Sequence, residues 1–238
     1  MRSKYINTFD TTSEFENYIE SAEPGFPNVA YTKDTGDIHY TSTSPNDHLI
    51  YGTLSDPTKP PVFSVWSNRV EYPITATVDA VSNTYYIDDL SSWGTGITSL
   101  QSLITSNADN VLSIKKFVFD TSSVTNINMM FNGCDAITYI NLYGLDTTSV
   151  DDTSGAFYYC PNLKTIDMSG WDLSNDDRRN WMFNSNLESI YITEEATLMK
   201  LTDNLTMANP GNGFIPSTAT IYYNDQVYKW QNGAWTLQ

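Results

Sequence analysis

The chain has 238 residues, of which 40% are hydrophobic and only 17% are charged, and its formal net charge at pH 7 is −16. A chain of this length can bury one large core or two to three small ones. No part of it is basic, which argues against binding to nucleic acid or to anionic membranes. No apolar run of about 18 residues is present, so membrane insertion is not expected. The acidic balance by itself indicates solubility.

Residues 1–45 predict a small attachment unit made of a helix and a hairpin. Ser13 and Glu16 have the spacing of a capping box, and the apolar residues that follow recur at helical intervals. The hairpin is expected over residues 29–41. A unit this small cannot be stable on its own core, so we expect it to become ordered against other chains.

Residues 46–92 predict a linker followed by a small β module. The stretch 42–61 is rich in Ser, Asp and Pro and is typical of a linker. Strands are predicted at 62–66, 70–78 and 85–87. Pro73 places the second of these strands at a sheet edge, because proline has no backbone N–H.

The stretch 93–192 repeats itself with a period of 26 residues. The same residue types recur at that spacing in several columns: Phe131, Phe157 and Phe183; Asp120, Asp146 and Asp172; Cys134 and Cys160. Each Phe precedes an apolar pattern that alternates at its end, which predicts a short strand with one buried face. A short helical turn is expected opposite the strand, over 125–131. The copy that begins at Trp93 is degenerate, and the last copy is two residues short.

One rung cannot bury its apolar face alone, so the copies are expected to stack with their strands in parallel. The predicted fold is β-rich α+β: a parallel leucine-rich-repeat solenoid of about four rungs, with small flanking β modules. Residues 193–238 predict a β meander that caps its end, with strands at 220–223, 227–230 and 234–237.

The column Asp120, Asp146 and Asp172 is the candidate metal site. Carboxylates on rungs about 5 Å apart favour a divalent cation. The alternative, which we favour, is that each Asp accepts hydrogen bonds within its own Asx turn. Cys134 and Cys160 share a column too, and we expect buried, reduced thiols rather than a disulfide.

Tyr222, Tyr228, Trp230 and Trp235 are the candidate binding residues. Such aromatic side chains can stack on sugars, but in a small meander they more often form the core. Neither a general acid and base nor a nucleophile with its base is visible, and His39 and His48 fit no zinc pattern. We therefore expect no enzymatic activity and no cofactor.

Two segments resemble known families. Phe119-Asp-Thr-Ser-Ser-Val-Thr-Asn, Met130-Phe131, Cys134 and Ile137-x-x-Ile140-x-Leu142 resemble the BspA-like leucine-rich repeats of bacterial surface proteins, which implies a parallel solenoid used in adhesion and display. Phe15-Glu16-Asn17-Tyr18-Ile19 and Pro27-Asn28-Val29-Ala30-Tyr31, with Asp37-Ile38-His39-Tyr40 closing the unit, resemble structural proteins of crAss-like tailed phages.

These resemblances imply a non-enzymatic structural or display protein of a tailed-phage virion: a capsid decoration, head fibre or tail-associated protein. Assembly in the host cytoplasm is expected, since residues 1–18 lack the apolar core of a signal peptide. The expected partners are other virion proteins, copies of the chain itself and a host surface glycan or protein. The alternative is a bacterial cell-surface leucine-rich-repeat adhesin that binds host protein or glycan.

Overall fold

The computed structural model of the chain describes residues 6–9, 28–32, 38–41, 48–93, 96–143, 145–175, 186–202 and 215–238. The chain divides into two compact units, Met1–His48 and Leu49–Gln238.

The first unit contains a three-stranded sheet in the order β1-β2-β3. Strands β2 (Asn28–Thr32) and β3 (Ile38–Thr41) pair antiparallel, which confirms the predicted hairpin. Strand β1 (Ile6–Phe9) pairs with β2 in parallel and was not predicted. The helix expected after Ser13 lies outside the described residues.

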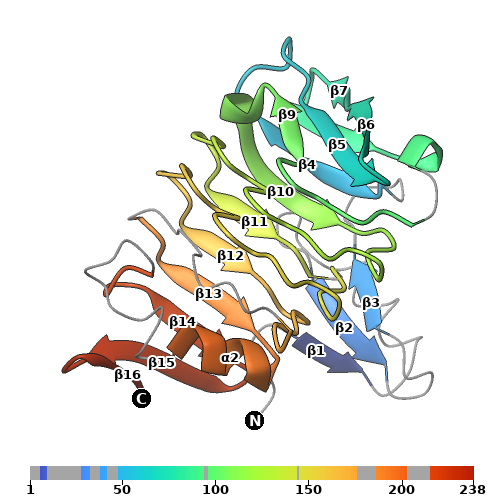
Figure 1. The fold of residues 1–238 in the computed structure, drawn as a ribbon. Helices are drawn as coiled ribbons and strands as arrows, with labels where there is room; N and C mark the ends of the chain where they lie inside the picture. Colours follow the sequence, from blue (N-terminus) through green and yellow to red (C-terminus); the bar gives the residue numbers. More distant parts are fainter. Residues whose placement is uncertain are drawn as a thin grey trace. The chain divides into compact units, whose positions relative to one another are not determined.

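The second unit is built on a ten-stranded sheet in the order β16-β15-β14-β13-β12-β11-β10-β4-β8-β7 (Figure 1). Its strands are β4 (Ile50–Leu54), β7 (Thr77–Asp79), β8 (Thr84–Ile87), β10 (Val111–Phe117), β11 (Tyr139–Asn141), β12 (Thr165–Asp167), β13 (Ser189–Ile192), β14 (Thr220–Tyr223), β15 (Gln226–Gln231) and β16 (Ala234–Leu237). A second sheet, in the order β6-β5-β9, contains β5 (Val62–Ser67), β6 (Val70–Thr75) and β9 (Ile104–Ser106).

Strands β10 to β14 run in parallel, as the repeat predicts. Tyr139 pairs with Thr165, 26 residues on, whereas Thr165 pairs with Ser189, only 24 residues on, which confirms the short last copy. The residues that share one register of the ladder form a column with 0% exposure: Ile114, Ile140, Ile166, Ile190 and Ile221. This column joins the rungs into one core.

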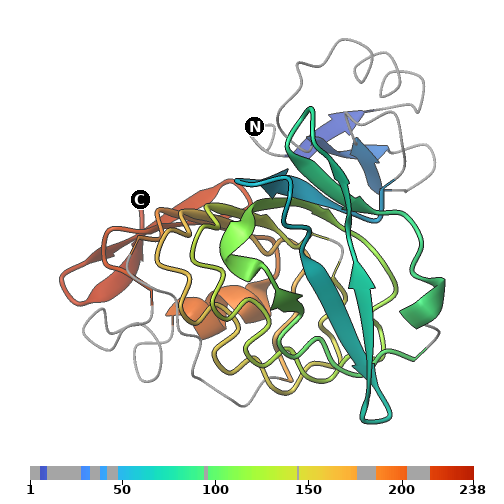
Figure 2. The same cartoon turned by 90° about the horizontal axis from the view of Figure 1, so that it is seen from above.

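The opposite side of the rungs is a second hydrogen-bonded ladder and not a helix. Isolated bridges connect Ser99 to Asn126 and Asn126 to Asp152. The helical turn predicted over 125–131 is wrong, because alternate N–H groups there donate to the next rung: Ile127 to Asp152, Met129 to Ser154 and Phe131 to Ala156, at 2.8–2.9 Å. Met129 also has a positive φ of 50°, which a right-handed helix excludes. Figure 2 shows the rungs as stacked loops.

The prediction of a linker over 42–61 is wrong for residues 50–54, which form the internal strand β4 of the ten-stranded sheet. Strand β4 pairs antiparallel with both β10 and β8. Its signal is short, because only Ile50, Gly52 and Leu54 point toward the packed side and polar residues flank them. Buried Asn110 fixes the loop that follows: its Nδ2 donates to Asp56 O at 2.8 Å and to Lys59 O at 2.7 Å.

The strand predicted at 70–78 is divided between the two sheets. Strand β6 contains Pro73 and forms an edge of the three-stranded sheet, as expected, whereas β7 forms an edge of the ten-stranded sheet. Buried Ala76 lies between them, and its N–H donates to Pro61 O at 3.0 Å. The strand predicted at 85–87 is confirmed as β8.

The predicted C-terminal meander is confirmed as β14, β15 and β16. It is not separate from the solenoid, since β14 pairs with β13 in parallel and the ladder therefore gains a fifth parallel strand. The connection between β13 and β14 contains a helix that the sequence did not reveal, α2 (Glu195–Thr202), whose Leu198 and Leu201 are buried. Within the described residues, no helix is long and apolar enough to cross a membrane.

Candidate functional site

The aspartate column forms Asx turns. Asp120 Oδ1 accepts the Ser122 N–H at 3.0 Å, and Asp146 Oδ1 accepts the Thr148 N–H at the same distance. Asp172 Oδ1 accepts the Ser174 N–H at 2.9 Å. The hydrogen bonds from Ser122 lower the pKa of Asp120, because they stabilise its carboxylate form. The turn interpretation is therefore confirmed.

Neighbouring threonines fasten these turns to one another. Asp146 N donates to Thr121 Oγ1 at 2.7 Å, and Thr121 Oγ1 donates to Asp146 O at 3.2 Å. Thr147 makes the same two contacts with Asp172. Across the described part of the chain, no three His, Cys, Asp or Glu side chains gather into a group that could hold a metal ion. Thr121 and Thr147 thus hold neighbouring turns in register, whereas the Asp side chains shape each turn.

Cys134 and Cys160 lie on neighbouring rungs as free, buried thiols. A hydrogen bond with the Cys160 thiol, together with burial, raises the pKa of Cys134 well above its usual value. The Cys160 thiol donates to Phe131 O at 3.0 Å. The Cys134 thiol is therefore protonated at neutral pH, and both cysteines are buried in the core.

The four aromatic candidates of the C-terminal strands are divided between the two faces of the sheet. Tyr228, Trp230 and Trp235 share the face of buried Ile221. Trp235 is 8% exposed, and its ring contacts that of Trp230 edge-to-face at 5.8 Å. The core interpretation is thus confirmed for Trp235, and Tyr228 and Trp230 are partly buried and pack against the core. Tyr222 belongs to the other face.

A row of residues crosses the parallel strands on the face opposite the isoleucine column, and the sequence analysis missed it. Its members are partly buried, apart from Asn141, which is buried. We call it the outer row: Lys115, Asn141, Asp167, Tyr191 and Tyr222. Tyr191 and Tyr222 stack at 4.8 Å between ring centroids with an interplanar angle of 13°. A sequence signal for this row exists, because each of its members after Lys115 directly follows a buried Ile of the parallel strands.

The outer row contains a desolvated carboxylate. Asp167 has a raised pKa because burial disfavours its charge, although its Oδ1 accepts the Ser169 N–H at 2.9 Å. Tyr139, in the adjacent column, has a pKa raised by burial and by the negative charges of Asp167 and Tyr191. On the previous rung the neutral Asn141 occupies the position of Asp167 and accepts the Tyr143 N–H at 2.9 Å.

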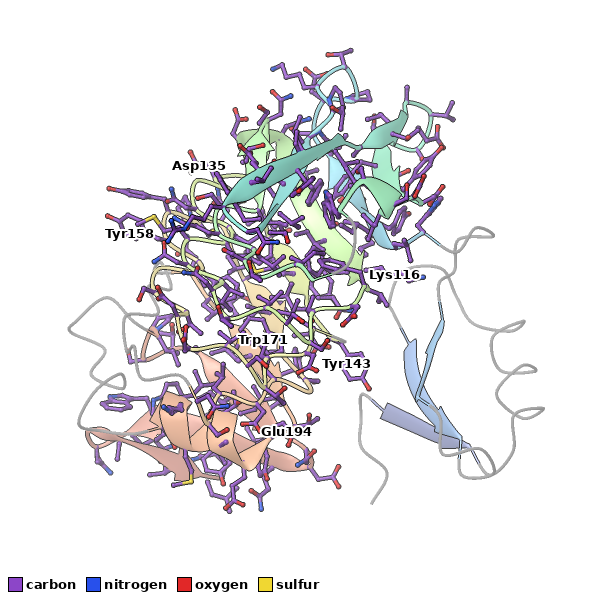
Figure 3. The ribbon with its side chains drawn as sticks, turned by 45° about the vertical axis from the view of Figure 1, so that its right-hand side comes forward. Lys116, Asp135, Tyr143, Tyr158, Trp171 and Glu194 are labelled. Atoms are coloured by element: carbon purple, nitrogen blue, oxygen red, sulfur yellow. The ribbon has the colours of Figure 1, made fainter. Side chains whose placement is uncertain are left out.

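The side chains of the turns form a different surface. Figure 3 shows Asp135 and Tyr158 projecting from the side of the turns, whereas Trp171 lies inside the body. Tyr159, next to Tyr158, is 56% exposed, and the two rings lie 4.0 Å apart. The parallel strands and the turns thus present separate faces.

This arrangement defines the class of the second unit: a β-rich, solenoid-like stack in which consecutive strands run in parallel. One comparison is consistent with this class. Residues 75–191 match the model of a family described as "Mycoplasma protein of unknown function, DUF285", and this family is related to leucine-rich-repeat-like repeats. No curated protein and no solved structure shows significant similarity to the chain. None of these comparisons supports the phage resemblance of the N-terminal segment.

Proposed function

We propose that this chain is a non-enzymatic docking and display protein whose solenoid binds another macromolecule through the outer row. The observation that carries the proposal is the stacked pair Tyr191 and Tyr222 beside half-buried Asp167, all on a hydrogen-bonded sheet. Tyrosine is enriched in protein interfaces because it supplies a large contact area with few rotatable bonds. Parallel strands hold these side chains at fixed spacing.

The roles of the reactive side chains support a binding function over a catalytic one. The three aspartates of the column accept hydrogen bonds from their own turns. The two cysteines are buried in the core. The aspartates thus shape their own turns, and the Cys160 thiol donates to Phe131 O on the neighbouring rung, so these polar groups support the shape of the solenoid.

The setting that we propose is the virion of a tailed phage, where the chain would act as a capsid decoration, head fibre or tail-associated protein. This part rests on the resemblance of segments within residues 15–40 to phage structural proteins. The separate compact unit Met1–His48 suits an attachment module, since the unit Leu49–Gln238 has its own core. The solenoid would then face outward, toward other virion proteins or a host surface.

The first experiment tests attachment and setting together. Mass spectrometry of purified particles should detect the full-length chain, and deletion of residues 1–45 should leave a folded solenoid that is lost from the particles. Particles that retain the truncated protein at the full-length level would contradict the attachment role.

The second experiment tests the outer row. The double substitution Tyr191→Ser and Tyr222→Ser should weaken binding to the partner by about tenfold or more, because two central aromatic contacts are removed. The matched control is Tyr159→Ser on the side of the turns, which should bind like the wild type. Equal binding by all three proteins would refute the role of the row.

The alternative is a bacterial cell-surface adhesin that binds host protein or glycan, as the BspA-like resemblance implies. The match of residues 75–191 to a family described from Mycoplasma favours this alternative. Immunolabelling separates the two settings. A chain that is found on intact bacterial cells and is missing from particles belongs to the adhesin class, and the outer-row test applies to it unchanged.

A further inference from the structure

Strand β16 forms the end of the ten-stranded sheet and pairs with β15 (Figure 1). In this pair Thr236 lies opposite Lys229, and Trp235 lies opposite Trp230. Among the described residues, no strand pairs with the other side of β16. The last strand of the solenoid sheet is therefore an edge.

The outer side of β16 presents the backbone groups of two residues. Gln238 N donates to Val227 O at 2.9 Å, so Gln238 belongs to a hydrogen-bonded pair with β15. Hydrogen-bonded and non-hydrogen-bonded pairs alternate along an antiparallel ladder. Thr236 and Ala234 therefore also form hydrogen-bonded pairs with β15. The N–H and C=O groups of Trp235 and Leu237 therefore point away from β15.

The other edge strands of this unit carry features that discourage pairing, and β16 does not. Strand β7 contains Asp79, and β6 contains Glu71 and Pro73. Next to β9, the second ladder continues, since Leu103 N donates to Met130 O at 3.0 Å. Charged residues and proline are common means of protecting an edge. Strand β16 has the sequence Ala-Trp-Thr-Leu and lacks both.

We infer that β16 pairs antiparallel with β16 of a second copy of this chain, about a two-fold axis at Thr236. In this register Trp235 faces Leu237 of the second copy, and the outward groups of both residues are matched, giving four backbone hydrogen bonds by the antiparallel pattern. A register centred on Trp235 would require Gly233 to pair as well. Gly233 has a φ of 84°, which is not an extended conformation.

The side chains favour a copy of the same chain as the occupant. Leu237 is 54% exposed and lies on the same face as buried Trp235, so each copy would cover the exposed leucine of the other. The strand has no charge to oppose this contact, although the whole chain carries −16.

The nearest charged side chain on β15 or β16 is Lys229, opposite Thr236. In the dimer the two Lys229 residues would be separated by three strand spacings, from β15 through both copies of β16 to the second β15, which is about 14 Å. This distance exceeds the screening length of about 8 Å at physiological salt. Their repulsion is therefore screened.

The contact is small, and its strength follows from its size. Four residues from each copy bury less surface than a standard stable interface, which needs more than about 1,000 Å² in total. We therefore expect reversible self-association that grows with concentration. The inference concerns the isolated full-length chain and stands whether or not the docking proposal is correct.

The register is tested by cysteine cross-linking of the full-length protein. In the proposed dimer the two Thr236 residues face each other as a non-hydrogen-bonded pair, with Cα atoms about 4.5 Å apart, which a disulfide can span. Thr236→Cys should therefore give a disulfide-linked dimer on mild oxidation. The matched control is Lys229→Cys, one strand further in, which should give at least about tenfold less dimer because the separation exceeds the reach of a disulfide. Equal yields from the two variants would overturn the register.

The edge itself is tested by sedimentation velocity over a concentration series. Leu237→Pro removes an outward N–H and leaves the pairing with β15 intact, because a residue before proline favours the extended conformation that Thr236 already has. Wild type and Leu237→Val should associate, and Leu237→Pro should stay monomeric with an unchanged circular dichroism spectrum. A wild type that remains monomeric throughout, or a proline variant that associates equally, would overturn the inference.

Discussion

Replacing Phe157 with Ala tests whether the aromatic column is the core of the solenoid. The Phe157 side chain is 0% exposed. Its ring stacks on Phe131 at 5.7 Å and on Trp171 at 6.4 Å, so the substitution opens a cavity between rungs and removes two ring contacts. Truncating a buried Phe typically costs about 3–5 kcal/mol, and each aromatic pair contributes about 0.5–1.5 kcal/mol beyond its buried area. We expect a loss of about 4–5 kcal/mol in the free energy of unfolding.

The assay is urea unfolding followed by tryptophan fluorescence, to which buried Trp171 contributes. The expected loss is a large share of the roughly 5–15 kcal/mol that stabilises a typical domain. Tyr159→Ala is the control, because that ring is 56% exposed and its removal should cost less than about 1 kcal/mol. If Phe157→Ala also costs less than about 1 kcal/mol, the column is not the core.

Three further predictions concern the sheet, a buried charge and activity. Gly52→Ala should lower the free energy of unfolding by about 3 kcal/mol or more, since an added Cβ would lie 2.0 Å from the backbone oxygen of Ser113. The control is Gly133→Ala, which has open space around its Cβ and a φ of +75° and should lose only about 1–2 kcal/mol. Equal losses in the two variants would refute the steric argument. Asp167→Asn should raise the melting temperature at pH 7, because the raised pKa of Asp167 means that the folded state disfavours its charge. The gain should shrink as the pH falls through the folded-state pKa toward 3.8, since the wild-type carboxyl then becomes neutral. A lower melting temperature of the variant at pH 7 would contradict this prediction. The purified protein should release no product from common glycans or peptides, and turnover abolished by one Asp or Glu substitution would overturn this expectation.

The repeat could be predicted because its signal is periodic and each member occupies the same environment. The columns of Phe, Asp and Cys at 26-residue spacing predict the parallel ladder, and the Asp side chains form the predicted Asx turns. The short last copy was also visible. In the repeats the local residue pattern and the long-range strand pairing agree, so a single sequence is sufficient to predict the ladder.

The parts that could not be predicted depend on contacts between distant residues. Strand β4 has only three alternating positions, and its place beside β10 depends on Gly52, which lets Tyr85 approach Ser113. The Tyr85 hydroxyl donates to Ser113 O at 3.1 Å. Helix α2 belongs to a connection with no counterpart in the other rungs.

The outer row was missed for a different reason. Its members are an asparagine, an aspartate and two tyrosines after Lys115, so they share a position in the fold but no residue type. A search for recurring residue types cannot detect such a row. It becomes visible only when the buried column has fixed which positions face outward.

The stacking of rungs also has a consequence for how such a gene can change. Neighbouring rungs bond through equivalent positions, as Tyr139 does with Thr165 and Asn126 with Asp152. Unequal crossing-over between two copies would add or remove one whole period and leave a chain whose new neighbours still match. The interval between β12 and β13 is already two residues shorter than the one before it, so the ladder tolerates small slips as well. Descendants of this gene should therefore differ in length by whole rungs, while both ends of the sheet stay the same.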